Sequence, residues 1–397
     1  MCSQPYQFEP LMPSSARMEP LLAKAHDLAR AATLLAGTAV PAELRDLLRA
    51  MNSYYSNRIE GQHTRPHEIE DALRKDFSSD ALLAAKQRLA VAHIEAEAAL
   101  ELRFAGSEGA SALYAEGAVQ VIHQELFGRL PAADLITSED EAVVPGGLRQ
   151  REVRVGQHVA PAFASVPLFL QRWGRFYADV RRGEAALVGA ACAHQRLGWI
   201  HPFVDGNGRV MRLHTHTLLH ALGYTGGLWS PLRGFARSTE RYYALLADAD
   251  SLRRGDLDGR GNLSEQALMA WADYVLDICL DQVGFMAGSL ELASLKARLE
   301  ACLVFESSVL KSGVRQESLR GLHYLFLSGE EMARGEFKTM LGMSDRGATD
   351  ALGALIKRGL LKSDSPQGRV RFGLPQHALR FLFPKLWPEA EADAREP

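Results

Sequence analysis

The chain contains 397 residues, which is enough for two or three domains and excludes a small scaffold held together only by disulfides or a metal. Apolar residues make up 47% and charged residues 23%, values typical of globular proteins, so neither wholesale disorder nor a fibrous repeat fits. The 45 Lys and Arg against 48 Asp and Glu give a formal net charge of −3, so no overall field attracts nucleic acid or an anionic membrane.

The N-terminal third of the sequence predicts an arm followed by helices. Residues 1–18 contain three prolines and lack periodicity, so we expect a flexible arm there. Apolar residues then recur at helical spacing over 21–32, and a second amphipathic stretch covers 41–61. Residues 65–130 predict three further helices.

The middle of the chain is predicted to be a helical bundle with one hairpin. Strand signals are almost confined to 149–159, where valines lie beside glycines. Helical periodicity returns over 166–177, 185–200 and, after a glycine-rich break, 209–222, with further helices across 239–300.

The pattern changes near residue 309. Two helix candidates, a glycine turn and a helix over 345–358 precede two short strand signals at 360–362 and 369–372. This order is typical of a winged helix, so we predict a winged helix-turn-helix domain over 309–388. Residues 389–397 are charged, Ala-rich and free of aromatics, which predicts a solvated tail.

The cysteines and the apolar runs indicate a cellular compartment. Cys2, Cys192, Cys279 and Cys302 lie far apart with no C-x-x-C pair, so the sequence offers neither a zinc knuckle nor a disulfide framework. The longest apolar runs fall short of the roughly 18 residues that a membrane span needs, and the N-terminus lacks a basic region followed by an apolar one. We therefore expect a cytoplasmic protein without a membrane partner.

The most informative stretch is 201–212, which reads HPFVDGNGRVMR and lies between two predicted helices. The proline after His201 disfavours helix at that position, so the imidazole should stand at a helix-to-loop junction. Gly206 and Gly208, which flank Asn207, can turn successive backbone amides toward one point. The following helix aims its unpaired amides and dipole at the same place, so the sequence predicts a phosphate site.

The charged residues around this loop fit a polyphosphate. Arg209 and Arg212 lie three apart on one face of the helix, in first turns where the dipole disfavours cations unless an anion lies between them. Asp205 is a hard oxygen donor suited to an Mg²⁺ ion that bridges two phosphates of a nucleotide. His201, with an ordinary pKa near neutrality, is suited to removing a proton from an incoming hydroxyl. The alternative is a capped Asp-Gly-Asn-Gly turn without chemistry, whereas a Walker A loop and a dinucleotide fold are excluded.

The same stretch matches the HPFx[D/E]GNGRxxR signature of the Fic family at every defining position. The resemblance implies a mostly α-helical protein: a Fic-type helical bundle with a short β-hairpin flap, followed by the C-terminal winged-helix domain. It also implies transfer of AMP from Mg-ATP to a Ser, Thr or Tyr hydroxyl of a target protein. In that reaction His201 would be the general base, Asp205 the magnesium ligand and Arg212 the γ-phosphate contact. The contacts to the α- and β-phosphates would come from Gly206, Asn207, Gly208 and Arg209.

The resemblance gives expected roles to two further segments. The hairpin at 148–159 resembles a flap that pins an extended segment of the target protein by pairing with it as a strand, and its alternative is a surface hairpin without a partner. Tyr242 and Tyr243 resemble the adenine side of the nucleotide site, and we assign this contact to Tyr243. The alternative is a pair of core aromatics.

Residues 56–61, Ser-Asn-Arg-Ile-Glu-Gly, match the [S/T]xxxE[G/N] inhibitory motif of Fic proteins, which assigns an inhibitory role to Ser56 and Glu60. A carboxylate at the end of a helix faces the negative end of the dipole, so a cation elsewhere should hold it, and Arg212 is the candidate. Such a pair would leave ATP only a pose that is not aligned for in-line attack. The alternative is a solvated glutamate, and removal of AMP by the same glutamate stays open.

The expected domains are a flexible arm at 1–18, an N-terminal helical region with the inhibitory helix at 19–110, a Fic catalytic core at 111–300, the winged helix at 309–388 and the tail at 389–397.

The C-terminal segment and the histidines leave other possibilities open. Residues 337–373 carry seven Lys and Arg against three Asp, a modest footprint for DNA, but two of the acids lie at the start of the presumed recognition helix. Protein docking or a homodimer contact is therefore preferred to DNA. The alternative functions are a nucleotide-sensing transcriptional regulator and a transferase of UMP or phosphocholine. Four histidines are interpreted as core or solvated rather than metal ligands: His194, His214, His216 and His220.

Overall fold

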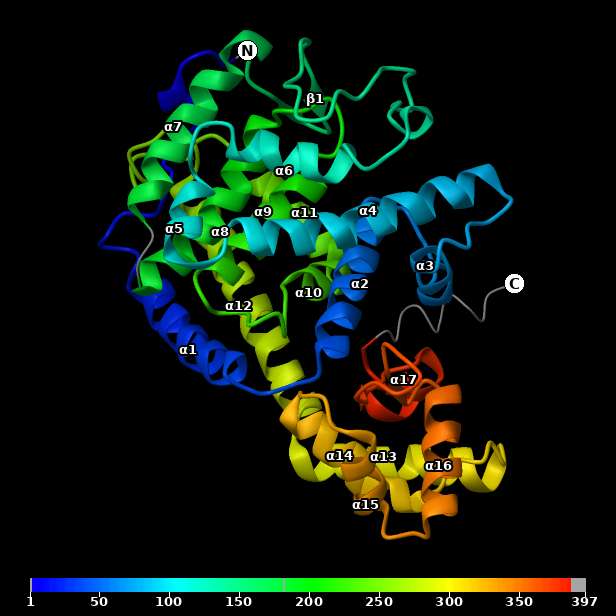
Figure 1. The fold of residues 1–397 in the computed structure, drawn as a ribbon. Helices are drawn as coiled ribbons and strands as arrows, with labels where there is room; N and C mark the ends of the chain where they lie inside the picture. The colour runs from blue at the N-terminus through cyan, green and yellow to red at the C-terminus, as the bar shows by residue number, and fades with distance from the viewer. Residues whose placement is uncertain (1, 181–182, 387–397) are drawn as a thin grey trace. The chain divides into compact units, whose positions relative to one another are not determined.

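The computed structural model describes residues 2–180 and 183–386 (Figure 1). The chain forms two compact units. The larger unit comprises Met1–Ala36 and Asn52–Gly284, and the smaller unit comprises Gly37–Met51 and Phe285–Pro397. Two helices, α2 and α12, contribute residues to both units.

The larger unit is almost entirely helical. Its helices are α1 (Glu19–Ala36), the second part of α2 (Ala42–Ile59), α3 (Pro66–Leu73), α4 (Ala81–Arg103), α5 (Gly106–Ala112), α6 (Ala118–Phe127), α7 (Val166–Asp179), α8 (Gly183–Ile200), α9 (Asn207–Ala221), α10 (Leu232–Arg237), α11 (Thr239–Asp248) and most of α12 (Glu265–Ser289). Short 3₁₀ turns occur at Pro5–Phe8, Ala132–Asp134 and Phe163–Ser165.

Helix α8 lies at the centre of the larger unit, with α1, α7 and α9 packed against it (Figure 1). Fourteen of its residues are buried, which explains why its sequence is apolar and small on every side rather than on one stripe. The indole nitrogens of Trp173 and Trp271 donate to the Ala193 and Ala191 carbonyls, at 3.0 and 2.7 Å, which ties α7 and α12 to α8. Helix α9 in turn contacts α4, α5 and α6.

The prediction of a flexible arm at 1–18 is wrong for the residues that the structure describes. The side chains of Phe8 and Leu11 are fully buried. The Tyr177 hydroxyl donates to the Leu11 carbonyl at 2.5 Å, and the Arg196 guanidinium donates to the Pro10 carbonyl at 3.0 and 2.8 Å. Prolines suppress helical periodicity, but an irregular segment can still insert apolar side chains into a core.

The structure also divides the chain differently from the expected domains. Residues 37–51, expected in the N-terminal region, belong to the smaller unit, and the larger unit ends at Gly284 rather than near residue 300. Periodicity runs unbroken along α2 and α12, so the sequence carries no mark where one helix passes from one core to another. Residues 65–130 hold four helices instead of three. The sequence does not predict α5, because that short helix is rich in glycine and small residues and carries no apolar periodicity.

The predicted hairpin is present but shorter than expected. Strand β1 (Arg154–Val155) pairs with β2 (His158–Val159) in antiparallel register, with Arg154 opposite Val159. Gly156 turns the chain at φ +60°, a conformation that glycine adopts without steric cost.

The smaller unit has the element order that the sequence predicts after residue 309. It contains the start of α2, α13 (Leu292–Val304), a π-helical turn (Phe305–Val309), a 3₁₀ turn (Gln316–Ser318), α14 (Leu319–Ser328), α15 (Arg334–Leu341), α16 (Asp345–Lys357), β3 (Leu361–Lys362), β4 (Arg371–Phe372) and α17 (Gln376–Leu382). Strands β3 and β4 pair antiparallel, and Met332 bridges to Val370 beside them. The tail predicted at 389–397 lies outside the described residues.

Several basic side chains of the smaller unit are engaged within it. Arg358 donates two hydrogen bonds of 2.7 Å to the buried Glu306 carboxylate. Arg371 pairs with Glu43 at 2.7 Å, and the burial of Glu43 shows that this contact lies inside the fold. These ion pairs weaken the positive footprint that the sequence suggests for DNA.

Within the described residues, no single helix has the length and apolar character to cross a membrane, although the bent pair Glu265–Ser289 and Leu292–Val309 meets those criteria together.

Candidate active site

His201 stands at the junction that the sequence predicts. Helix α8 ends at Ile200, and His201 adopts a positive φ of +49° while its backbone N–H still donates to the Leu197 carbonyl at 3.1 Å. Burial, together with the neighbouring His158 and Arg149, lowers the pKa of His201 to about 4. The imidazole is therefore neutral at physiological pH, and its lone pair is available to accept a proton.

A tight loop connects His201 to α9. Gly206 occupies the N-cap position of α9 at φ +78°, and a Cβ there would overlap the Phe127 ring. The Asn207 side chain closes the loop on itself, since its Oδ1 accepts from the Phe203 N–H and its Nδ2 donates to the Phe203 carbonyl, both at 2.9 Å. The backbone amides at the start of α9 are thereby held in one orientation.

Replacing Gly206 with alanine is expected to destabilise the larger unit by about 2–4 kcal/mol, which combines left-handed backbone strain with overpacking against Phe127. Gly223 is the matched control, because it has φ +83° with open space around its Cβ direction. Gly223→Ala should cost only the backbone strain. Thermal unfolding of both variants measures the difference, and equal losses of stability would contradict the predicted clash.

Two buried residues that the sequence does not single out fix this loop. The His123 Nδ1 accepts from the Gly146 N–H at 2.8 Å, and its Nε2–H donates to the Asp205 carbonyl at 3.3 Å. Its ring stacks on Phe203 with centroids 4.0 Å apart. Burial lowers the pKa of His123 to about 4, in keeping with one donor and one acceptor nitrogen.

Arg149 is the second of these residues, and it fixes the backbone at the base of the hairpin. Its fully buried guanidinium donates to the carbonyls of His201 at 2.8 Å, Arg151 at 2.8 Å and Pro161 at 2.6 Å. The hairpin is thus joined to the backbone of the predicted base. A lone arginine or histidine carries no sequence signal for such a role, because its partners are backbone groups and most of them are more than ten positions away.

The two arginines of the motif turn toward the C-terminal end of α2. Arg212 is completely buried and donates to the Ser56 hydroxyl at 3.1 Å, to the Ser56 carbonyl at 3.0 Å and to the Glu60 carboxylate at 2.6 Å. Arg209 donates to the Asn57 side chain at 3.1 Å. The ion pair that the sequence predicts between Glu60 and Arg212 is therefore present.

Glu60 lies directly after α2, where Gly61 turns the chain at φ +73° and the Tyr243 hydroxyl donates to the Ile59 carbonyl at 3.1 Å. Its carboxylate rests on Gly208, so close that a Cβ on that glycine would overlap it. Burial alone would raise the pKa of Glu60, but the charges of Arg212 and Arg209 outweigh it and hold the pKa below its usual value. An ionised carboxylate thus occupies the first turn of α9, where the sequence predicts phosphate.

A cavity of about 1120 Å³ lies over these residues. It is lined by six of the predicted site residues: Glu60, His201, Asn207, Gly208, Arg212 and Tyr243. The hairpin residues 155–159 border the same cavity. Tyr243 is partly exposed there, whereas Tyr242 is buried in the core with its hydroxyl 3.0 Å from His194 Nε2.

Four predicted residues are not among those that line the cavity: Ser56, Asp205, Gly206 and Arg209. Gly206 faces Phe127, and Arg209 is turned to Asn57. Asp205 is exposed beside the loop, and a free carboxylate is the kind of oxygen donor that Mg²⁺ takes together with phosphates, so this residue fits the predicted ion.

The cavity is also lined by a second titratable pair that sequence reasoning missed. His158 of β2 donates to the Trp199 carbonyl at 2.8 Å, and its Nδ1 lies 3.8 Å from the Asp250 carboxylate. Burial raises the pKa of Asp250 to about 6. These two residues lie 92 positions apart in the chain, so no local sequence pattern reveals the pair.

The fold and the site together define a helical protein whose central loop joins a histidine to the amino end of a helix at one cavity. The Fic/DOC family model matches residues 114–219, the segment that holds this loop, and those residues form a Fic domain. The chain is 42% identical over 80 residues to the protein adenylyltransferase Fic of Drosophila ananassae and to that of Drosophila melanogaster. Each match covers 20% of this chain and only 16% of the relative's length.

A solved structure extends the likeness in fold beyond that segment. The crystal structure of a Fic family protein from Desulfovibrio desulfuricans G20 superposes with a TM-score of 0.53 and covers 93% of this chain and 99% of its own. The two sequences are 19% identical, so the comparison concerns the fold alone.

Proposed function

We propose that this protein transfers AMP from ATP to a hydroxyl group of a target protein. The observation that carries the proposal is that a neutral His201 and the amino end of α9, with Arg212, line one cavity. The likeness to proteins named adenylyltransferase over the 80 matched residues supports the choice of nucleotide.

The chain supplies a general base and a phosphate-binding turn for this reaction. His201 accepts the proton of the incoming hydroxyl, whose oxygen forms a bond to the α-phosphorus of ATP. The bond from that phosphorus to the bridging oxygen of the β-phosphate breaks, and pyrophosphate leaves. The oriented amides of Asn207 and Gly208 stabilise the charge on the transferring phosphoryl group. Asp205 would hold Mg²⁺, which supplies charge neutralisation for the phosphates when bound.

The proposal includes a resting state in which Glu60 restrains the enzyme. Its carboxylate forms an ion pair with Arg212 and lies against Gly208. The γ-phosphate of ATP would then lose Arg212 as its cationic contact, and the carboxylate would fill the space that this phosphate needs. Ser56 contributes by holding the Arg212 guanidinium through both its hydroxyl and its carbonyl. ATP that enters this state would not be aligned for in-line attack.

The target protein is proposed to dock at the hairpin. Val155 and Val159 are about half exposed at the cavity rim, and a two-stranded hairpin offers an outer edge for a third strand. A hydroxyl carried by such a strand would be delivered toward His201.

The transferred group can be identified with labelled nucleotide. A Glu60→Gly variant is incubated with cell lysate and ATP labelled on the α- or the γ-phosphate, and protein-bound label is measured. Label from the α-phosphate alone supports AMP transfer. Label from the γ-phosphate would contradict it, and labelling only from UTP or a choline nucleotide would replace AMP by another group.

The acid limb of the pH profile provides a second test. A general base acts in its unprotonated form, so a pKa of about 4 for His201 keeps it active at lower pH than an ordinary histidine. In the Glu60→Gly variant kcat/KM, which reports the free enzyme, is expected to stay nearly constant from about pH 7.5 to about pH 5.5. An unshifted histidine would lose about tenfold at pH 5.5. Circular dichroism at each pH controls for unfolding, and a midpoint near 6.5 would contradict the expectation.

A further inference from the structure

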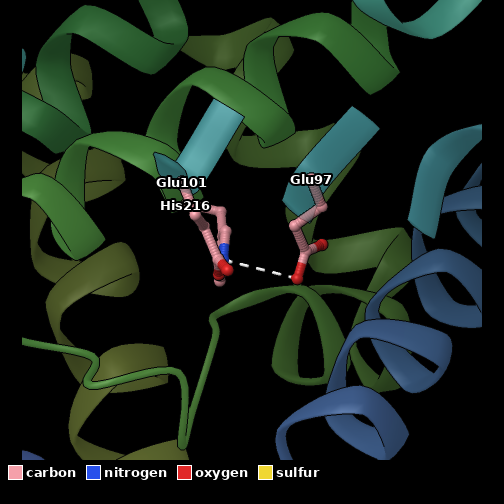
Figure 2. A group of neighbouring side chains, drawn as sticks. All are labelled: Glu97, Glu101 and His216. Carbon is pink, nitrogen blue, oxygen red and sulfur yellow. Dashed lines mark hydrogen bonds and ion pairs between the residues drawn. The ribbon is translucent and has the colours of Figure 1, made fainter. Parts of the chain in front are cut away.

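A second cluster of ionisable side chains lies between α4 and α9, apart from the cavity. Glu97 and Glu101 come from successive turns of α4, and His216 comes from α9 (Figure 2). Their side chains point toward one another, and their exposed fractions are only 1%, 5% and 1%. The His216 Nε2 lies 3.0 Å from the nearer Glu101 oxygen and 3.4 Å from the nearer Glu97 oxygen.

A further imidazole lies beside this cluster. His93 lies one turn before Glu97 on α4 and is completely buried. Its Nδ1 lies 4.0 Å from the second Glu97 oxygen. Among the residues that the structure describes, neither ring nitrogen of His93 has a hydrogen-bond partner. A buried polar group without a partner is costly, so its presence beside two carboxylates points to a ligand that it helps to bind.

The geometry and the donor types suit a metal ion. The ligand atoms of Glu97, Glu101 and His216 lie within 4.8 Å of one another. Two ligands about 2.1 Å from a common ion are separated by roughly 3.0–3.4 Å in octahedral or tetrahedral geometry, the separations found from His216 to the two carboxylates. Imidazole together with carboxylate is a donor set typical of divalent transition metals.

Neighbouring polar side chains orient the two carboxylates. Asn52 donates to the Glu97 oxygen nearest His216 at 2.8 Å, which orients that carboxylate in the way that outer-shell groups orient metal ligands. The His220 Nδ1 lies 3.7 Å from the Glu101 oxygen that faces His216. The two carboxyl groups would contribute two negative charges when they bind as ligands, a number that one divalent cation balances.

We propose that Glu97, Glu101 and His216 bind one divalent transition-metal ion such as Zn²⁺, with the unpartnered His93 beside this ligand set. The ion would have a structural role, because it joins α4 to α9, and His216 lies one turn after Arg212 on α9. It would therefore hold in place the helix that carries the phosphate-binding turn. The sequence analysis interprets His216 as a core or solvated histidine. The two carboxylate partners lie more than a hundred positions away in the chain, so no local pattern reveals them. This inference does not depend on the proposed function.

The direct test is the metal content of the full chain, produced without a polyhistidine tag in zinc-supplemented medium. Inductively coupled plasma mass spectrometry should find about one zinc per chain. After chelation and dialysis, added ZnCl₂ should raise the melting temperature by several degrees, since a ligand that binds only the folded state stabilises it. A chain without zinc whose melting temperature is insensitive to ZnCl₂ overturns the proposal.

Matched variants locate the ion. The double change Glu97→Gln and Glu101→Gln keeps the side-chain shapes and should abolish stoichiometric zinc. Glu95→Gln on the same helix is the control, because its side chain is 58% exposed, and it should retain zinc. Equal zinc content in both variants would place the ion elsewhere and overturn the proposal. Should the double variant fail to fold, zinc K-edge absorption of the unmodified chain decides, since sulfur ligation contradicts the site and nitrogen and oxygen ligation supports it.

Discussion

Glu60→Gly is expected to raise AMP transfer by about 10- to 100-fold. The change removes the 2.6 Å hydrogen bond to Arg212 and clears the carboxylate from Gly208. A hydrogen bond between charged groups contributes about 1.5–3 kcal/mol, and about 1.4 kcal/mol corresponds to a factor of ten in rate or binding. The measurement is the initial rate of label transfer from α-labelled ATP to protein, including self-labelling.

A second variant separates charge from space. Glu60→Gln keeps the side chain on Gly208 but removes its charge, so it should give an increase smaller than that of the glycine variant. Arg212 would then be free of its ionised partner while the volume above α9 stays filled. If both variants transfer AMP no faster than the unmodified chain although they bind ATP normally, Glu60 has no restraining role.

His201→Ala in the Glu60→Gly background is expected to lower AMP transfer by a factor of about 10²–10⁴, the usual contribution of a positioned general base. The hydroxyl would lose the group that accepts its proton, whereas the phosphate-binding turn of α9 and Arg212 would stay intact. The measurement compares the rate of label transfer with ATP affinity, and only the rate should fall.

The control for this variant is His26→Ala, which removes a histidine with a 66% exposed side chain on α1. It should leave the rate unchanged. A His201→Ala enzyme that retains most of its activity would assign the base to another group, and His158, which lines the same cavity, would be the next candidate. A parallel loss of ATP affinity would instead indicate a role for His201 in nucleotide binding.

The local features of the candidate site are readable from sequence because each is made by neighbours in the chain. A proline places His201 at a helix end, glycines permit the left-handed turn before α9, and a Schellman-type end places Glu60 at the terminus of α2. The same holds for the helices, whose periodicity predicts most of them to within a few residues. Where periodicity is silent, as at the buried segment around Phe8, the prediction fails.

By itself, the sequence determined a mostly helical Fic-type protein, the loop that joins His201 to Arg212, and the glutamate that would compete for that arginine. Only the tertiary structure decided that Arg209 turns to Asn57, that His123 and Arg149 hold the loop and the hairpin together, and that α4 and α9 gather two carboxylates around His216. The physical reason is the range of the interactions. Turns and helix ends depend on residues a few positions apart, whereas buried polar contacts depend on which distant elements the core brings into register.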